Sequence, residues 1–368
     1  MSERKMAYVA EITDLQPIDG RDRIVCATVN GGWKTVVNKG QFKVGDWCVY
    51  CEIDSFIPEE VAPFLTKGKK PKVFNAVSGN VLKTVRLGGQ ISQGLALEIS
   101  TLPVEELNFL GEDVGGRLGI VKYEKPEFAV NGQMAGDFPG FIRKTDQNRI
   151  QNVIKDLVNN HLTEDFEISE KLEGSSMTVY YNQGFGVCSR NVEMQLGGGS
   201  TYTNVAEKLG LPSMWQDFCE YLQTPLAVQG ELIGPGIQGN IYGLDKHEFR
   251  VFSLFNIRTG TPFFPYETRK IIELFNVNAQ DGKALVLAPS QSFSKPFAKA
   301  NDMLLNLGGR TNPEAVNQVS ELLLEQLLEL ANGYSQLNPS VLREGLVFKS
   351  EESDFTFKVI SNMYLEKN

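Results

Sequence analysis

The most constraining feature of this chain is a succession of short apolar segments in its first hundred residues. We expect strands at residues 6–12, 24–29, 34–37, 47–53 and 95–99. Glycine-containing turn signals separate several of these segments, as at Asn30-Gly31-Gly32 and Val44-Gly45-Asp46. Strands this short and this regularly spaced predict a small β-barrel.

A five-stranded barrel of the OB type is the commonest small barrel that reads nucleic acid strands, and its loops make the contacts. One loop of the expected barrel contains glycine, proline and four basic residues: Lys67, Lys69, Lys70 and Lys72. A solvated loop explains these charges about as well as a phosphate-contacting site. We therefore predict an OB-fold nucleic-acid-binding domain over residues 1–105, with these four lysines as candidate nucleic-acid contacts.

The overall composition sets the class of protein. A chain of 368 residues is expected to form two domains. Its net charge of −9 argues against a generally basic surface, although a local basic groove remains compatible with it. There is no apolar run of about 18 residues and no apolar stretch behind the N-terminus, so we expect no membrane segment and no secretory signal. Five scattered cysteines are an odd count, which favours a reducing, cytoplasmic setting.

The residue composition and the pattern of apolar residues change along the chain. Glycines and prolines punctuate residues 106–140, which we interpret as a linker. From residue 141 a second domain is expected, reaching residue 368. It opens with helical spacing of apolar residues at 149–158 and continues with strands. A leucine-rich helix is expected at 315–330, and a stripe of leucines is far more often core than a partner site.

A lysine-containing motif suggests chemistry in this second domain. Lys171, Glu173 and Gly174 lie between two apolar runs that contain Phe166 and Met177. If the motif is strand, Lys171 and Glu173 point to the same face, and Gly174 lets a bulky ligand approach the backbone. Such a site suits a lysine nucleophile that attacks a nucleotide phosphorus beside a metal. Taken alone, a surface strand with an ion pair is favoured by roughly two to one.

Six segments in a fixed order reverse those odds. They resemble the motifs of the covalent nucleotidyltransferases, the superfamily of DNA ligases, RNA ligases and mRNA-capping enzymes. In chain order they are Lys171-Leu172-Glu173-Gly174, Cys188-Ser189-Arg190-Asn191, Gly230-Glu231-Leu232, Phe249-Arg250-Val251-Phe252, Glu344-Gly345-Leu346-Val347-Phe348-Lys349 and Phe357-Lys358-Val359. Each match is weak, and Phe252 alone is more often core than ligand stack. The inference depends on the six segments occurring in the same order as the motifs of the superfamily.

The resemblance implies roles for individual residues. The catalytic residues it implies are Lys171, Lys349 and Lys358. The residues it implies for ATP are Glu170, Arg190, Glu231, Phe252, Lys349, Lys358, Arg149 and Gln151. Within that set the resemblance implies that Arg190 contacts nucleotide or phosphate, that the Glu231 carboxylate holds ribose and that Phe252 stacks on the purine. Glu173 and Glu344 are hard oxygen donors suited to Mg²⁺ or Mn²⁺, directly or through water.

The nucleophile also needs a suitable environment. A free lysine has a pKa near 10.4 and is a non-nucleophilic ammonium at neutral pH. Lys349, Lys358 and a bound metal are the cations expected to lower the pKa of Lys171. The same cations would bind the triphosphate and neutralise the charge that develops as pyrophosphate leaves.

Three other signals are weak. Gly234-Pro235-Gly236-Ile237-Gln238-Gly239 matches a dinucleotide fingerprint, but it contains a proline and no clear helix follows, so we expect a loop. Cys48 and Cys51 have the spacing of a zinc pair without a second pair. Two histidines, His161 and His247, are poor material for histidine-based catalysis.

The arrangement of domains narrows the family. A candidate OB domain precedes the motifs, and the given sequence ends ten residues after Lys358, where DNA ligases and capping enzymes usually continue into an OB domain. This arrangement, and the segment 143–152, resemble the ATP-dependent RNA ligases of the Deinococcus and Naegleria type. The resemblance implies an α+β chain: an OB barrel followed by an adenylyltransferase domain of ATP-grasp-like antiparallel sheets with flanking helices. Ser253 and Thr356 depart from the pattern, since many relatives carry aspartate and lysine there.

The implied activity is sealing of RNA ends in three steps. Lys171 takes AMP from ATP, the AMP passes to a 5′-phosphate, and a 3′-OH then attacks that phosphate and releases AMP. The expected substrate is RNA or an RNA-containing nicked duplex, in a repair role, and we expect a monomer. Two alternatives stay open: an ATP-dependent DNA ligase, and a non-catalytic OB protein that binds RNA ends.

Overall fold

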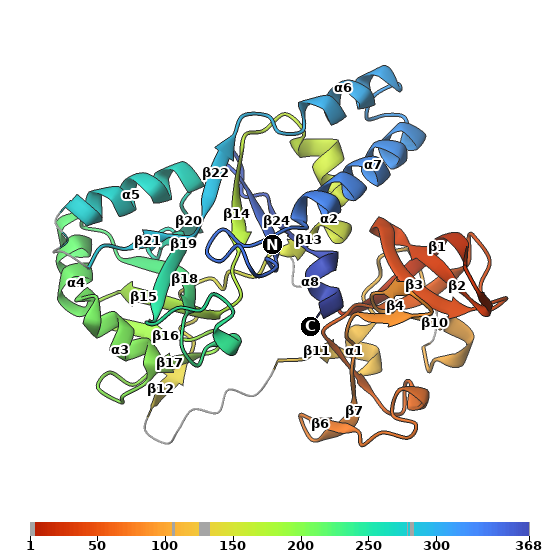
Figure 1. Ribbon diagram of the computed structural model, residues 1–368, viewed down its shortest axis with the longest axis horizontal. Helices are drawn as coiled ribbons and strands as arrows, with labels where there is room; N and C mark the ends of the chain where they lie inside the picture. Colours follow the sequence, from red (N-terminus) through yellow and green to blue (C-terminus); the bar gives the residue numbers. More distant parts are fainter. Residues whose placement is uncertain (1–3, 105–106, 125–132, 278, 280–282, 368) are drawn as a thin grey trace. The chain divides into compact units, whose positions relative to one another are not determined.

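The computed structural model describes residues 4–104, 107–124, 133–277, 279 and 283–367. The chain divides into two compact units, Met1–Pro126 and Glu127–Lys367 (Figure 1). None of the helices in the described ranges is long and apolar enough to cross a membrane.

The first unit is built on a five-stranded sheet in the order β10–β4–β1–β2–β3. Its strands are β1 (Ala7–Ile18), β2 (Arg21–Val29), β3 (Trp33–Asn38), β4 (Trp47–Cys51) and β10 (Leu95–Glu98). The sheet curves closed where the amide of Gln93 donates to the carbonyl oxygen of Lys34, at 2.7 Å. Gly94 is required at this closure, because its φ is +104° and a Cβ there would lie 2.6 Å from the carbonyl oxygen of Cys51. The five strands expected from the sequence are the strands of this barrel, so the predicted barrel is confirmed.

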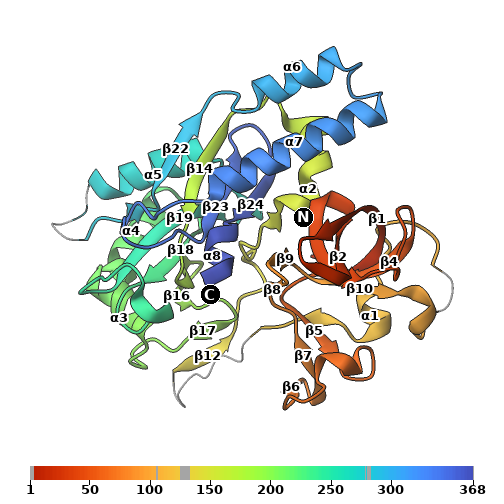
Figure 2. The same ribbon diagram turned by 45° about the vertical axis from the view of Figure 1, so that its right-hand side comes forward.

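Further strands, which the sequence did not reveal, extend the first unit. They form a sheet β11–β5–β7–β6 and a separate β8–β9 pair. Figure 2 labels β5 to β9, and Figure 1 labels β11. Their bounds are β5 (Ser55–Pro58), β6 (Lys72–Phe74), β7 (Val77–Val81), β8 (Val85–Leu87), β9 (Gln90–Ser92) and β11 (Val121–Lys122), and the short helix α1 spans Gly115–Leu118. The expected linker at 106–140 thus contributes α1 and β11 to this unit. Residues 105–106, at the expected domain boundary, and 125–132 lie outside the described ranges.

The second unit contains two sheets, and the first has the order β12–β17–β16–β15–β18–β19–β20, with β21 paired to β19. Its strands are β12 (Met134–Asp137), β15 (Ser175–Tyr181), β16 (Phe185–Cys188), β17 (Val192–Met194), β18 (Leu226–Ile233), β19 (Glu248–Asn256), β20 (Thr261–Pro262) and β21 (Val286–Leu287). The helices α3 (Thr201–Lys208), α4 (Leu211–Tyr221) and α5 (Pro265–Val277) cover it (Figure 1). Trp215 of α4 and Phe275 of α5 are buried against its apolar strand residues.

The second sheet has the order β13–β24–β23–β14–β22. Its strands are β13 (Asn148–Arg149), β14 (Phe166–Lys171), β22 (Ser290–Phe293), β23 (Gly345–Ser350) and β24 (Thr356–Ile360). The helices of this part are α2 (Ile150–Asp156), a π-helical turn (Leu157–His161), α6 (Ala298–Asn306), α7 (Pro313–Ala331) and α8 (Asn362–Lys367). The side chain of Asn312 accepts from the amide of Glu314 and caps α7.

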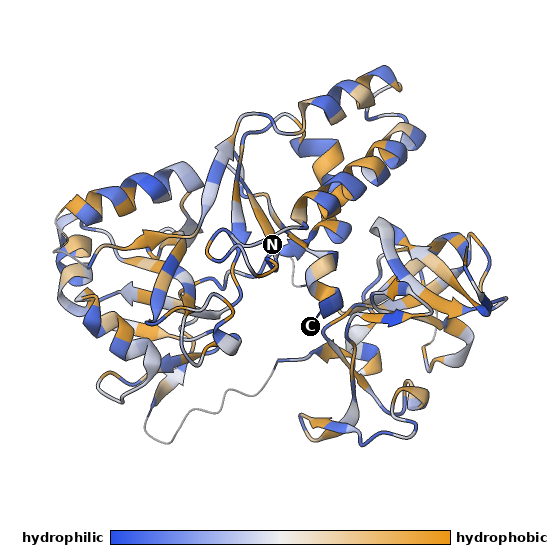
Figure 3. Ribbon diagram, viewed as in Figure 1, coloured by the Kyte–Doolittle hydropathy of each residue, from blue (hydrophilic) through white to orange (hydrophobic). Residues whose placement is uncertain are grey.

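The leucine-rich helix α7 serves packing, as predicted. Hydrophobic and hydrophilic residues both occur along its length in Figure 3. Its apolar residues Leu323, Leu324 and Leu327 are buried in one core cluster with strands of the second sheet. The helix expected at 149–158 is also present, as α2 and the first residues of the π-helical turn.

The lysine motif differs locally from our expectation. β14 ends at Lys171 and β15 begins at Ser175, so strand alternation does not place Lys171 and Glu173 on one face. The structure also gives Gly174 a role that we did not expect, while close approach of a ligand to its backbone stays a prediction. A Cβ at this residue would lie 2.6 Å from the carbonyl oxygen of Leu232, so close approach of strand β18 requires the glycine.

Candidate active site

A cavity of about 150 Å³ in the second unit brings together most of the predicted site residues. The two predicted metal residues, Glu173 and Glu344, are not among its lining residues, although both act on Lys171. The cavity lies between the two sheets of this unit, because its lining comes from β14, β15, β18, β19, β23 and β24 together with loop residues. The lining residues are Thr145, Asp146, Gln147, Ser169, Glu170, Lys171, Leu172, Ser176, Arg190, Glu231, Phe252, Ala288, Val347, Lys349 and Lys358. Six of the sequence motifs therefore converge on one pocket, although they span 189 positions of the chain from 171 to 359.

Lys171 stands at the end of β14, where that strand pairs with Gly345 of β23. Its Nζ lies 2.6 Å from Oε2 of Glu344. Burial by itself lowers the pKa of a lysine, but the charges of Glu344, Glu231 and Glu173 outweigh it and raise the pKa of Lys171. We expected Lys349, Lys358 and a bound metal to lower this pKa, but the charges of the chain's own residues raise it, and the effect of a metal stays a prediction. Among the described residues, the charges that act most strongly on Lys171 are those of carboxylates.

These carboxylates form an electrostatically costly group. Burial, together with the charges of Glu344 and Glu173, raises the pKa of Glu231 to about 8, against the lowering effect of Lys171. Glu173, Glu231 and Glu344 share the single ammonium of Lys171, and a divalent cation would relieve the repulsion that raises the pKa of Glu231. In the described part of the chain, no three acidic, histidine or cysteine side chains are arranged to hold one ion directly. The donor set therefore fits a hydrated Mg²⁺ or Mn²⁺ that keeps several of its waters.

Glu170 precedes the nucleophile and is almost fully buried, with 3% of its surface exposed. Its Oε2 accepts a hydrogen bond from the amide of Gln336, at 2.7 Å. Its Oε1 is buried without a hydrogen-bond partner, and the residue lines the cavity. An unsatisfied buried carboxylate oxygen costs free energy unless a ligand donates to it.

Phe252 and Lys349 form a second contact in the cavity wall. The Nζ of Lys349 donates to the carbonyl oxygen of Phe252 and lies 5.3 Å from the centre of its ring. Burial lowers the pKa of Lys349, while the charge of Glu167, opposite it on strand β14, acts in the other direction. A buried ammonium beside an aromatic ring is suited to a ligand that combines a flat base with negative charge.

Asp146 joins two of the predicted phosphate-binding cations. Its Oδ2 lies 3.1 Å from Nη2 of Arg190, and its Oδ1 lies 3.5 Å from Nζ of Lys358. Arg149 is paired with Lys358 in the parallel register of β13 and β24. Arg149 and Gln151 are buried and are not among the lining residues of the cavity.

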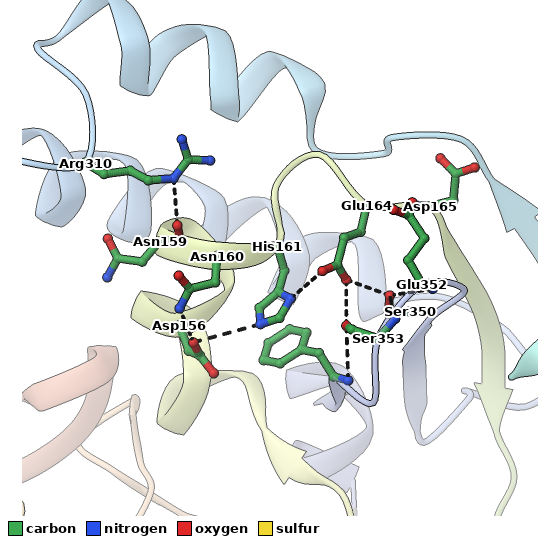
Figure 4. Close-up of polar contacts among 11 residues, drawn as sticks. Asp156, Asn159, Asn160, His161, Glu164, Asp165, Arg310, Ser350, Glu352 and Ser353 are labelled. Atoms are coloured by element: carbon green, nitrogen blue, oxygen red, sulfur yellow. Dashed lines mark hydrogen bonds and ion pairs between the residues drawn. The ribbon is translucent and has the colours of Figure 1, made fainter. Parts of the chain in front are cut away.

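The β23–β24 hairpin, which carries Lys349 and Lys358, is held from outside the cavity by Glu164 (Figure 4). The Oε2 of Glu164 accepts from the hydroxyls of Ser350, at 2.6 Å, and Ser353, at 2.9 Å. Its Oε1 lies 2.8 Å from Nδ1 of His161, whose ring stacks on Phe355. This network fixes the turn between the two strands and therefore the position of both lysines.

The four candidate nucleic-acid lysines belong to the first unit. Lys67, Lys69, Lys70 and Lys72 are all exposed. Lys72 begins β6, and its Nζ lies 5.1 Å from the centre of the Tyr123 ring. Their exposure leaves them accessible to phosphates, as the hypothesis requires.

Sequence reasoning missed three residues that shape the site. Asp146 lies in the segment 143–152, whose resemblance to the ligases was noted without singling it out. Tyr242 accepts from the amide of Glu173, at 2.7 Å, and Tyr364 donates to the carboxylate of Glu173. Each tyrosine contacts Glu173 from a distant part of the sequence, and no motif spacing marks such a contact. Only the folded structure therefore reveals these two hydrogen bonds.

Comparison with known proteins gives matches over both units. Residues 6–99 match an OB-fold domain, and residues 164–360 match the RNA ligase family. The structure of Naegleria gruberi RNA ligase with PPi is 36% identical, with a TM-score of 0.82, and the match covers 100% of this chain and 99% of that chain. A mutant of the same enzyme with ATP and Mn is 36% identical, with a TM-score of 0.81 and 99% of each chain covered. Another mutant, with AMP and Mn, has a TM-score of 0.82 at 36% identity, again over 99% of each chain. No curated protein matches the chain.

Proposed function

We propose a mechanism for this chain, which belongs to the RNA ligase family and is an ATP-dependent RNA ligase. In this mechanism Lys171 is the nucleophile that takes AMP from ATP. The observation that carries the assignment is the convergence of Lys171, Arg190, Glu231, Phe252, Lys349 and Lys358 on one cavity. ATP and a divalent cation, Mg²⁺ or Mn²⁺, are the cofactors.

In the first step the Nζ of Lys171 attacks the α-phosphorus of ATP. A nitrogen–phosphorus bond forms, the bond from that phosphorus to the bridging oxygen breaks, and pyrophosphate leaves with the bonding electron pair. The Lys171 ammonium loses one proton to become the attacking amine and a second as the lysyl-AMP forms, so its nitrogen keeps one hydrogen and both protons pass to solvent or to the pyrophosphate. Arg190, Lys349 and Lys358 supply positive charge for the phosphates, since positioning and electrostatics dominate phosphoryl transfer.

Deprotonation of Lys171 is the difficult part of this step. The ion pair between Nζ of Lys171 and Oε2 of Glu344, at 2.6 Å, stabilises the protonated form of Lys171. The same ion pair directs the side chain of Lys171 toward Glu344. A divalent cation bound through Glu173 and Glu344 would supply the countercharge that lets Lys171 release its proton. Glu231 holds the ribose in this proposal, from a position beside the nucleophile.

The same cavity offers recognition of adenine. Phe252 provides a ring for stacking, and Oε1 of Glu170 provides an acceptor without a protein partner. The amino group of adenine donates hydrogen bonds, whereas guanine presents a carbonyl oxygen at that position and would meet the carboxylate unfavourably. Glu170 therefore favours ATP over GTP. Arg149 and Gln151 are proposed to contribute from the buried β13–α2 junction.

The later steps act on RNA. AMP passes from Lys171 to the 5′-phosphate, and the 3′-OH attacks that phosphate and displaces AMP. We assign the first unit, with Lys67, Lys69, Lys70 and Lys72, to contact with the strands that flank the break, because an OB barrel with exposed lysines suits a phosphate backbone. An RNA-containing nicked duplex and a repair role are the proposed context. A monomer in the cytoplasm is proposed as well, and five free cysteines support the reducing setting.

The test compares two nicked duplexes that differ only in the sugar at the 3′-OH end. We expect sealing when the terminal nucleotide is a ribonucleotide and little sealing when it is a deoxyribonucleotide. Equal sealing of both would favour a DNA ligase activity and would overturn the proposed substrate. A variant with alanine at all four loop lysines is expected to seal poorly while it still forms lysyl-AMP at the normal rate, and unchanged sealing would refute the role of the loop.

A further inference from the structure

We infer that Tyr364 of α8 is a positioning residue that orients the carboxylate of Glu173 toward the divalent cation. The inference rests on the proposed function, in which Glu173 acts on the metal. Tyr364 belongs to none of the six ligase motifs, and it acts through Glu173 rather than on a reacting atom.

Glu173 is held at two points by two tyrosines. The phenol of Tyr364 donates a hydrogen bond to Oε2 of Glu173. The phenol oxygen of Tyr242 accepts from the backbone amide of the same residue, at 2.7 Å. The backbone contact fixes where the side chain begins, and the side-chain contact fixes which way its carboxylate turns. Glu173 follows the end of β14, so the sheet alone does not impose this orientation.

The segment that carries Tyr364 is also bonded to the other proposed metal residue. The amide of Ser361 donates to the carbonyl oxygen of Glu344, at 2.9 Å. The hydroxyl of Ser361 accepts from the amide of Tyr364, at 3.1 Å, and donates to Oδ1 of Asn332, at 3.0 Å. Residues 361–364 therefore connect the backbone of Glu344 to the side chain of Glu173, and they hold the two carboxylate residues in one arrangement.

Such a contact has a definite physical effect. A carboxylate on a metal or on its waters binds best when its orientation is fixed in advance, and hydrogen bonds from neighbouring groups do this. The phenol has one proton to give, so it fixes one carboxylate oxygen and leaves acceptor capacity on both for the hydrated ion. Loss of a contact of this kind typically weakens metal binding by about 10-fold to 100-fold.

The test measures Mn²⁺ binding to the nucleotide-free full chain by the loss of the free-ion paramagnetic resonance signal. Tyr364→Phe removes only the phenol oxygen, and we expect about a 10-fold weaker affinity for Mn²⁺ with an unchanged unfolding midpoint. Met363→Ala is the matched control, because this neighbouring side chain is 43% exposed, and it is expected to bind Mn²⁺ normally. Unchanged affinity in Tyr364→Phe would overturn the inference.

A double-mutant cycle separates this inference from the proposed function beneath it. Glu173→Gln is expected to weaken Mn²⁺ binding, and Tyr364→Phe is expected to add nothing in that background, since its effect passes through Glu173. Additive losses would refute the positioning role and leave the metal role of Glu173 standing. If Glu173→Gln bound Mn²⁺ normally, the metal role itself would fail, and the inference would fail with it.

Discussion

Glu231→Gln should make this protein more stable at alkaline pH, because the native carboxylate is held in an unfavourable place. Burial and the charges of Glu344 and Glu173 raise its pKa to about 8 from the ordinary 4.5. A change of this size corresponds to about 5 kcal/mol of free energy. The side chain faces the cavity, where part of its charge reaches water, so we expect about 2–3 kcal/mol to be observed.

The sign of the pH dependence follows from the direction of the pKa change. Below about pH 4.5 the carboxyl is protonated in both the folded and the unfolded chain, so the stability cost is absent. Between pH 4.5 and about 8 the unfolded chain releases the proton while the folded chain retains it, and stability falls as the pH rises. Above about pH 8 the cost is constant. Glutamine carries no charge, so the variant does not have this stability cost at any pH.

The assay is thermal unfolding of the wild type and of Glu231→Gln at pH 5 and pH 9. The two proteins should unfold at similar temperatures at pH 5. At pH 9 the variant should unfold roughly 5–10 °C higher. Mg²⁺ should narrow the difference by supplying countercharge. A variant that is no more stable at pH 9, or a gain that does not depend on pH, would refute the electrostatic reasoning.

Three further predictions concern side chains around the cavity. Asp146→Asn removes the charge that faces Arg190 and Lys358, so calorimetry in a Lys171→Ala background should show about twofold to fivefold tighter ATP binding. Glu170→Gln replaces an acceptor-only carboxylate with an amide, so the ratio of adenylylation rates with ATP and GTP should fall about tenfold. Glu164→Ala leaves the hydroxyls of two serines without their acceptor, so urea unfolding should show a loss of about 2 kcal/mol.

The sequence predicted the elements of this protein better than the contacts of its site. The barrel strands and α7 were predictable because their apolar patterns report burial directly. The additional strands of the first unit have two to five residues, and they are largely exposed at Lys72–Phe74 but fully buried at Ser55–Pro58, so no alternating burial pattern is long enough to mark them. The ordered motifs identified residues that line the cavity, because each motif contains residue types that nucleotidyl transfer requires.

The electrostatics around the nucleophile were not predictable in the same way. We expected cations beside Lys171, but Glu344 contacts it directly and Lys349 contacts the carbonyl of Phe252 instead. Gly174 illustrates the same limit, since its requirement comes from strand β18, more than 50 positions away in the sequence. Motif order identifies which residues gather, whereas their pairing depends on distances that only the folded chain sets.

The covalent intermediate on Lys171 is the central claim, and its detection is the most direct measurement. Purified protein is incubated with ATP labelled at the α-phosphate and with Mg²⁺ or Mn²⁺, and is then separated under denaturing conditions. We expect a labelled protein band that requires the metal and that is lost in Lys171→Ala. A label that persists in Lys171→Ala, or no label on folded wild-type protein freed of bound AMP, would contradict this claim.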